Sequence, residues 1–112
     1  MTRLIYVMLA CLFSVAFSSA VHAGESFWID VRSAEEFEKD HVSLAVNIPY
    51  EEITARIGEV TEDRDAEIYL YCRSGRRADI ALEALEEMGY SRVVNLDSLE
   101  NARHKAADLN ED

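Results

Sequence analysis

Residues 72–77 bring together a thiol, a glycine and three basic side chains, in the order Cys72, Arg73, Ser74, Gly75, Arg76 and Arg77. The stretch before them has the pattern of a strand, and the stretch after them has the pattern of a helix. In a turn between a strand and a helix, successive backbone N–H groups converge and the helix adds its positive end, which favours an anion. Gly75 permits a backbone conformation that other residues resist. We therefore expect the Cys72 sulfur to lie among these N–H groups, where the nucleophilic thiolate is favoured.

The basic side chains of this turn contrast with the charge of the whole chain. The 112 residues contain 11 Lys and Arg against 22 Asp and Glu, a formal net charge of −11. This acidic balance argues against nucleic acid and against an anionic membrane as partners. The arginines of the turn reverse the sign locally and attract a small anion. The alternative is that Cys72 is a small buried apolar residue, as free cysteines often are, but its neighbours favour a reactive thiol.

The first 23 residues have the pattern of a secretory signal peptide. Arg3 supplies a positive charge, an almost unbroken apolar run covers 4–17, and Val21-His22-Ala23 is an acceptable cleavage site. The run is shorter than the ~20 residues that a membrane span needs, so an uncleaved anchor is the less favoured alternative. Lipid attachment through Cys11 is disfavoured because Cys11 lies inside the run. We expect export to a bacterial periplasm and a mature single domain of residues 24–112.

Cleavage would leave Cys72 as the only cysteine of the mature chain. A single cysteine excludes an internal disulfide and a cysteine-based zinc site. Exported proteins usually pair their cysteines, so an unpaired thiol there is a candidate for chemistry. The sequence has no metal-ligand spacing, and we expect a monomer that uses no metal and no cofactor.

Short apolar runs alternate with helical patterns after the leader. The expected strands cover 27–29, 45–48, 67–71 and 93–94, and the expected helices cover 34–39, 51–57, the segment from the turn to 88, and a last segment that follows Asp97. Strands that alternate with helices indicate an α/β fold, here a small four-stranded parallel sheet with helices on both faces. In such sheets ligands bind beyond the carboxyl ends of the strands, where the winding direction changes. Cys72 stands at such an end.

Local signals define the ends of these helices. Ser33 and Glu36 form a capping box for the first helix, in which Phe37 faces inward. Ile53 and Ile57 share one face of the second helix. Gly89 is placed to end the third helix in the left-handed conformation. We expect Asp97, with Glu100, to cap the last helix, whose inner face would carry Leu99, Ala102, Ala106 and Leu109.

Two motifs together give the mature chain a resemblance to a known family. The first comprises Asp30-Val31-Arg32, Glu36-Phe37, His41-Val42, Ala45 and Asn47-Ile48-Pro49, and the second is the turn 72–77. Over essentially the whole mature chain the sequence resembles a rhodanese domain, and it is most similar to the minimal exported members. The resemblance implies that the strand ending at Asp30 and the strand ending at Cys72 are neighbours.

The resemblance also implies a reaction. In it, the Cys72 thiolate attacks the outer sulfur of thiosulfate, sulfite leaves, and a persulfide remains on Cys72. An acceptor, either cyanide or a thiol, then removes that sulfur, so catalysis is covalent and occurs in two half-reactions. The partners are thus a small anionic sulfur donor such as thiosulfate and a thiol or cyanide acceptor.

Two other functions remain open. The small chain could be a persulfide carrier that docks on a partner and turns over poorly alone. It could also be a phosphatase or arsenate reductase of the same fold, but the related phosphatase loop is one residue longer. A cradle of backbone N–H groups is a receptor of fixed size, and the shorter loop favours sulfur transfer.

Roles for individual residues follow from the resemblance. Arg73 and Arg76 are expected to contact the substrate anion, although Arg76 could instead be a solvated surface charge. Ser74 and Gly75 belong to the substrate-binding loop, and Arg77 braces the loop or contacts the anion. Asp30 and Arg32 form a structural ion pair near the site, because such pairs also occur without a catalytic role.

The remaining polar positions have simpler roles. His41 and Asn47 pack and bind backbone groups, whereas Glu35, Glu36 and Glu38 are expected on a solvated face. In the region where the family often has Gly-Gly, this chain has Asp97-Ser98-Leu99, with Ser98-Leu99 in place of the glycines, and we expect this departure to affect substrate preference more than the chemistry.

Overall fold

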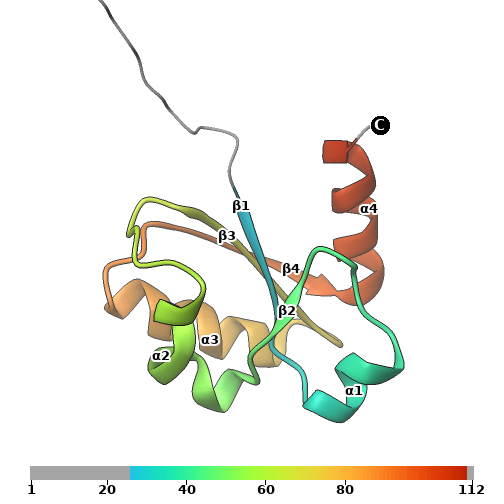
Figure 1. Cartoon of the computed structure of the whole chain (residues 1–112), viewed down its shortest axis with the longest axis horizontal. Helices are drawn as coiled ribbons and strands as arrows, with labels where there is room; N and C mark the ends of the chain where they lie inside the picture. The colour runs from blue at the N-terminus through green and yellow to red at the C-terminus, as the bar shows by residue number, and fades with distance from the viewer. Residues whose placement is uncertain (1–25, 111–112) are drawn as a thin grey trace, which may run out of the picture.

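The computed structural model describes residues 26–110. The predicted signal peptide, including Cys11 and the cleavage site, lies outside these residues. The strands are β1 (Ser26–Asp30), β2 (Val46–Asn47), β3 (Glu67–Cys72) and β4 (Arg92–Ser98). They form one parallel sheet in the spatial order β2-β1-β3-β4 (Figure 1). The winding direction changes between β1 and β3, which are neighbours as predicted.

The central strands are apolar on both faces and separate two cores. On one face lie Ile29, Ile68 and Leu70, and on the other lie Trp28 and Tyr69. This arrangement follows from the period of two along a strand, which sends successive side chains to opposite faces. Burial on both faces is typical of a parallel sheet.

The helices cover both faces of the sheet, as predicted. They are α1 (Ala34–Lys39), α2 (Ile53–Arg56), α3 (Arg76–Glu87) and α4 (Leu99–Asn110), with the short 3-10 turns η2 (Tyr50–Glu52) and η3 (Ile57–Glu59). α2 and α3 lie together on one face, and α1 and α4 lie toward the other (Figure 1). Phe37 of α1 and Ala102 of α4 pack in the second core, so both helices contribute to it.

Several local predictions are confirmed. Ser33 accepts a hydrogen bond from the Glu36 N–H, and the Glu36 carboxylate accepts one from the Ser33 N–H, which is the expected capping box. Gly89 follows α3 with φ of +100°. Ile53 and Ile57 are both buried against the first core.

The predicted helix over 51–57 is wrong as a single element. The segment is divided into η2, α2 and η3, and Pro49 precedes the first of them. None of the three pieces begins with a side-chain cap. Without such a cap the first N–H groups lack a local acceptor, and short segments then tend to tighten into 3-10 turns.

The end of the chain also differs from its prediction. β4 covers 92–98, because pairing with β3 extends it past Asn95 in spite of its polar side chain. Asp97 does not cap α4: its φ is +75°, and the Ser98 hydroxyl instead accepts the Asn101 N–H at 3.1 Å. Leu109 is 52 % exposed, because the C-terminal end of α4 projects away from the sheet (Figure 1).

Candidate active site

Cys72 is the last residue of β3 and lies at the carboxyl end of the sheet. β1 ends beside it, since Asp30 pairs with Tyr71 and the Val31 N–H donates to the Tyr71 carbonyl at 3.0 Å. The thiol therefore stands where the winding direction changes, which is where α/β sheets place their ligands.

Backbone N–H groups surround the Cys72 sulfur from the helix side. Sγ accepts the Gly75 N–H at 3.0 Å and the Ala78 N–H at 3.4 Å. Gly75 has φ of +95°, and α3 begins directly after it. The turn thus directs two N–H groups and the positive end of a 12-residue helix at one sulfur atom, which stabilises negative charge there.

Cys72 is reached through a cavity. The residue as a whole is only 1 % exposed, but it lines a cavity of about 410 Å³ together with Arg32, Arg73, Ser98, Leu99, Glu100 and Arg103. Burial limits the competition from water for the N–H groups, and the cavity has room for a small anion.

Arg77 is tied to the first helix. Its two terminal nitrogens donate to the two Glu36 carboxylate oxygens at 2.9 and 3.2 Å. The hydrogen bonds from Arg77 and, to a smaller extent, from the Ser33 N–H and hydroxyl together lower the pKa of Glu36 to about 2, although burial opposes the shift. The same pair raises the pKa of Arg77. The ion pair thus links α1 to the start of α3, and we call this link the Arg77–Glu36 brace.

The expectation that Glu36 lies on a solvated face is therefore wrong. Its side chain is 27 % exposed, and its carboxylate joins the capping box to Arg77. Arg77 is 41 positions away along the chain, so helix periodicity within 34–39 carries no signal of this pair.

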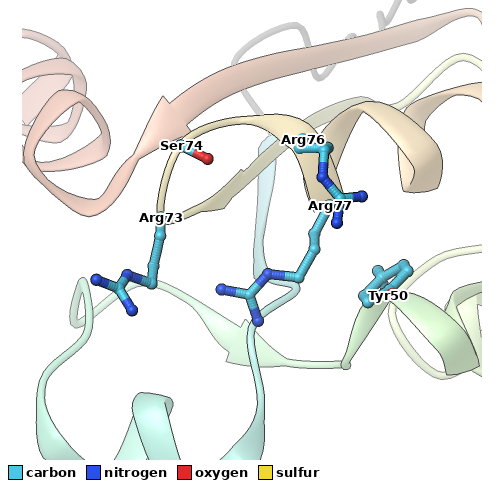
Figure 2. A pocket seen from close by; sticks show the side chains of 5 residues that line it. All are labelled: Tyr50, Arg73, Ser74, Arg76 and Arg77. Atoms are coloured by element: carbon cyan, nitrogen blue, oxygen red, sulfur yellow. The ribbon is translucent and has the colours of Figure 1, made fainter.

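A second hollow lies on the outer side of the turn. It has a volume of about 460 Å³ and is lined by Tyr50, Arg73, Ser74, Arg76 and Arg77. Figure 2 shows the side chains of Arg73 and Arg77 extending to the same side of the turn. Arg73 lines both cavities, and within residues 26–110 its guanidinium has no acidic partner. It is thus available to an anion in a way that Arg77 is not.

Asp30 and Arg32 form a buried ion pair beneath the site. Arg32 donates through Nε and Nη2 to the two Asp30 oxygens at 2.7–3.1 Å, and Nη2 also donates to the Asp40 carbonyl at 2.6 Å. Asp30 is fully buried. The hydrogen bonds that Arg32 donates to Asp30 raise the pKa of Arg32, although burial opposes the shift. The expected ion pair between Asp30 and Arg32 is therefore present. Arg32 also lines the Cys72 cavity.

Asn47 and His41 bind backbone groups. The Asn47 side-chain amide donates to the carbonyls of Asp30 and Arg32 at 3.0 and 2.9 Å. A ring nitrogen of His41 lies 2.7 Å from the Phe37 carbonyl oxygen, and the imidazole ring of His41 stacks on the phenyl ring of Phe37.

The sequence reasoning missed Asn95. Its side-chain amide donates to the Gly75 carbonyl at 2.9 Å, and its side-chain oxygen accepts the Asp97 N–H at 2.8 Å. The Gly75 carbonyl also accepts the Asp79 N–H of α3. The sequence shows a polar residue directly after Val93-Val94, which could have indicated a role for Asn95. Its partner, the Gly75 carbonyl in the turn after β3, is determined only by the pairing of β3 with β4.

Residues 26–110 hold no cluster of His, Cys, Asp and Glu side chains that could bind a metal ion. The helices in this part of the chain are all too short or too polar to cross a membrane.

The sequence model of the rhodanese-like domain family matches residues 16–98 of the chain. The chain belongs to the rhodanese-like domain family. The fold and the placement of Cys72 on a strand-to-helix turn agree with this membership, and the resemblance stated from the two motifs is confirmed.

Among rhodanese-like relatives, thiosulfate sulfurtransferase PspE of Escherichia coli is 40% identical over 88 residues, which is 79% of this chain and 84% of the relative. YrkF of Bacillus subtilis, whose name proposes a sulfur-carrier role, is 40% identical over 82 residues. That match covers 72% of this chain and 43% of YrkF, so the chain spans less than half of that relative.

Solved structures of rhodanese-like domains have the same fold. A rhodanese from E. coli solved with anions has a TM-score of 0.66 and 39% identity, covering 69% of this chain and 91% of that one. The human single-domain sulfurtransferase TSTD1 has a TM-score of 0.59 at 22% identity, covering 74% of this chain and 85% of that one. This second likeness concerns the fold alone.

Proposed function

We propose that the chain is a thiosulfate sulfurtransferase that carries the transferred sulfur as a persulfide on Cys72. The observation that carries the proposal is the pair of N–H groups, from Gly75 and Ala78, aimed at the Cys72 sulfur. These groups favour the thiolate before the reaction and would hold the charged outer sulfur of the persulfide after it. The 40% identity to PspE, a thiosulfate sulfurtransferase, supports the same chemistry.

The reaction proceeds in two half-reactions. The Cys72 thiolate attacks the outer sulfur of thiosulfate, the bond between its two sulfur atoms breaks, and sulfite leaves with the electron pair. Cyanide or a thiol then attacks the outer sulfur of the persulfide, which restores the thiolate. No redox partner is needed, because in each step one nucleophile displaces another from the same sulfur atom, and the leaving group takes the electron pair of the bond that breaks.

The arginines have different roles in this proposal. Arg73 contacts the sulfonate oxygens of the donor, since it lines the Cys72 cavity and has no acidic partner among residues 26–110. Arg76 is exposed and increases the positive potential beside the turn. Arg77 braces the turn through Glu36. Ser74 and Gly75 supply the turn itself, and the Asp30–Arg32 pair supports it from β1.

The test is a two-step assay on the purified chain. Thiosulfate alone should add about 32 Da, one sulfur atom, to Cys72, and cyanide should then release thiocyanate over many cycles. Lack of an adduct would refute the proposal. Aryl phosphate and arsenate serve as the comparison, because turnover of either would indicate a phosphatase or reductase.

A sulfur carrier is the second candidate function. The match to YrkF favours it, because a carrier needs the persulfide but not rapid release. A carrier would form the adduct from thiosulfate and then release thiocyanate slowly with cyanide. The rate of the second half-reaction therefore separates the two functions.

Export and assembly complete the proposal. We propose that residues 1–23 direct the chain to a periplasm and are removed, leaving a monomer of residues 24–112 that needs no metal. Mass spectrometry of the chain recovered from a periplasmic fraction should show Gly24 as its first residue. Light scattering should give the monomer mass, and a chelator should leave activity unchanged.

A further inference from the structure

Asp97 occupies an unusual backbone position next to the catalytic turn. It lies at the end of β4, where the register with β3 shifts: Leu70 pairs with Asn95, but Cys72 pairs with Ser98. Its φ of +75° is in the left-handed region, and it is the only non-glycine residue there among residues 26–110. Such positions cost free energy for side chains other than glycine and cluster at functional sites.

This conformation places the Asp97 carboxylate against Gly75. A Cβ atom added to Gly75 would lie 2.5 Å from Asp97 Oδ1 and 3.3 Å from Asp97 Cγ. The carboxylate therefore occupies the space directly beside Gly75. The N–H of the same glycine donates to the Cys72 sulfur at 3.0 Å. One residue of the turn thus touches the sulfur on one side and a carboxylate on the other.

The charge of this carboxylate is not neutralised by a neighbour. Within residues 26–110, its carboxylate oxygens take part in no hydrogen bond or ion pair, whereas its backbone N–H donates to the Asn95 side-chain oxygen. Asp97 is exposed, so water and salt weaken its field without removing it. Asp97 lines neither cavity, but its carboxylate lies beside Gly75, whose N–H donates to the Cys72 sulfur. From there its negative charge opposes an anion that binds at this N–H group.

The opposition depends on the charge of the anion. At a fixed position, a doubly charged donor is repelled twice as strongly as a singly charged one. A repulsive group that acts more strongly on one substrate than on another creates specificity.

We propose that Asp97 is a specificity-determining residue that selects against doubly charged sulfur donors and in favour of singly charged ones, such as organic thiosulfonates. This inference rests on the proposed sulfur transfer to Cys72. With a thiosulfonate, the thiolate attacks the outer sulfur, the bond between the two sulfur atoms breaks, and a sulfinate leaves with the electron pair. Charge balances as it does for thiosulfate, and the same persulfide forms.

The kinetic test compares thiosulfate with methanethiosulfonate in the wild type and in Asp97→Asn. The variant keeps the size and the tolerance for positive φ but removes the charge. We expect kcat/KM for thiosulfate to rise roughly two- to fivefold, with a clearly smaller rise for methanethiosulfonate. The difference should shrink at high ionic strength. Asp97→Gly removes the charge and also the side chain that makes the positive φ costly, so comparison with Asp97→Asn separates the effect of charge from that of backbone conformation. Glu87→Gln, at the far end of α3, is the control for the loss of one exposed negative charge.

A binding test measures the preference between doubly and singly charged anions without any catalytic turnover. Sulfate and methanesulfonate, which carry two and one charges, should protect Cys72 from alkylation by iodoacetamide, a neutral reagent. We expect Asp97→Asn to strengthen protection by sulfate more than protection by methanesulfonate, at constant ionic strength.

The outcomes separate the two proposals. Equal changes for the doubly and singly charged anions, or a change in Asp97→Gly but not in Asp97→Asn, would overturn the role of Asp97. If neither donor forms a persulfide but the anion preference shifts as expected, the proposed function fails and the charge selection by Asp97 stands.

Discussion

At the scale of single residues, Cys72 combines deep burial with access through one cavity. Its surroundings are built by the backbone of its own turn rather than by a neighbouring base. We interpret Cys72 as a residue placed for reaction, because its sulfur accepts two backbone N–H groups at the start of a helix. Its side chain also belongs to the first core, so packing is the alternative role.

Cys72→Ser tests this interpretation. We expect it to abolish the sulfur adduct and to lower the free energy of unfolding by less than about 1 kcal/mol, because the smaller hydroxyl can still accept the Gly75 N–H. Mass spectrometry and urea unfolding measure the two effects. A loss of folding equal to the loss of chemistry would favour the alternative of a buried apolar residue.

Arg73→Ala tests the contact with the donor. We expect KM for thiosulfate to rise roughly three- to tenfold with a smaller change in kcat, because the contact is made before the reaction. Steady-state kinetics at constant ionic strength measure this. Arg92 of β4 is exposed and lines neither cavity. Arg92→Ala is therefore the matched control for the loss of one arginine. An unchanged KM in Arg73→Ala would remove the role.

At the scale of elements, two braces hold the turn. Arg77 links the start of α3 to Glu36 of α1, and Asn95 links β4 to the Gly75 carbonyl. Both contacts join the turn to an element far from it along the chain. Together they restrict the movement of the turn and thereby maintain the orientation of its N–H groups.

The Arg77–Glu36 brace predicts a pH dependence of stability. The pKa of Glu36 is lowered from its usual 4.5 to about 2 in the folded chain. The stabilisation is therefore complete above about pH 4.5 and is lost as the pH falls toward 2. We expect Glu36→Gln to lower the free energy of unfolding by about 1–2 kcal/mol at pH 7, after allowance for screening. The gap to the wild type should close in urea titrations at decreasing pH.

The exposed pair Arg56–Glu52 provides the control. Its side chains are 38 % and 52 % exposed, so Glu52→Gln should change stability by only a few tenths of a kcal/mol. A gap for Glu36→Gln that stays constant down to pH 2.5 would contradict the brace.

Asn95→Ala tests the second brace. We expect the rate of persulfide formation, and the rate of Cys72 alkylation by iodoacetamide, to fall about five- to twentyfold, because the Gly75 carbonyl loses a partner that orients the turn. Circular dichroism should show an unchanged fold. Rates equal to the wild type would show that the Asp79 N–H alone is enough to hold this carbonyl.

At the scale of the whole molecule, an acidic chain carries a basic site. The net charge is −11, whereas the two cavities beside the turn are lined by five arginines and one acidic residue, Glu100. The arginines are Arg32, Arg73, Arg76, Arg77 and Arg103. The contrast directs small anions to the turn. Asp97 opposes that attraction at one point, which is how such a site could distinguish among anions.

Removal of residues 1–23 tests the proposed domain boundary. We expect residues 24–112 to unfold in a single cooperative transition and to keep the sulfurtransferase activity, because the sheet and both cores lie within residues 26–110. Thermal unfolding and the thiocyanate assay measure this. An unfolded or inactive product would place part of the domain in the first 23 residues.

Much of this arrangement follows from the sequence, because its causes are local. The period of two in 67–71, the Ser33 capping box and the positive φ at Gly89 depend on residues a few positions apart. The turn at Cys72 is equally local, since one strand end, one glycine and one helix start create its cradle. The sequence alone therefore determined the fold class and the position of Cys72 at the end of a strand, before a helix.

Only the tertiary structure decided how the cradle is held and what surrounds it. Glu36 meets Arg77, Asn95 meets Gly75, and Asp97 lies against Gly75 only because β3 pairs with β4 and α1 lies beside the start of α3. These contacts depend on strand register and on helix placement across the sheet. The packing of the whole domain sets both, and no short stretch of sequence contains it.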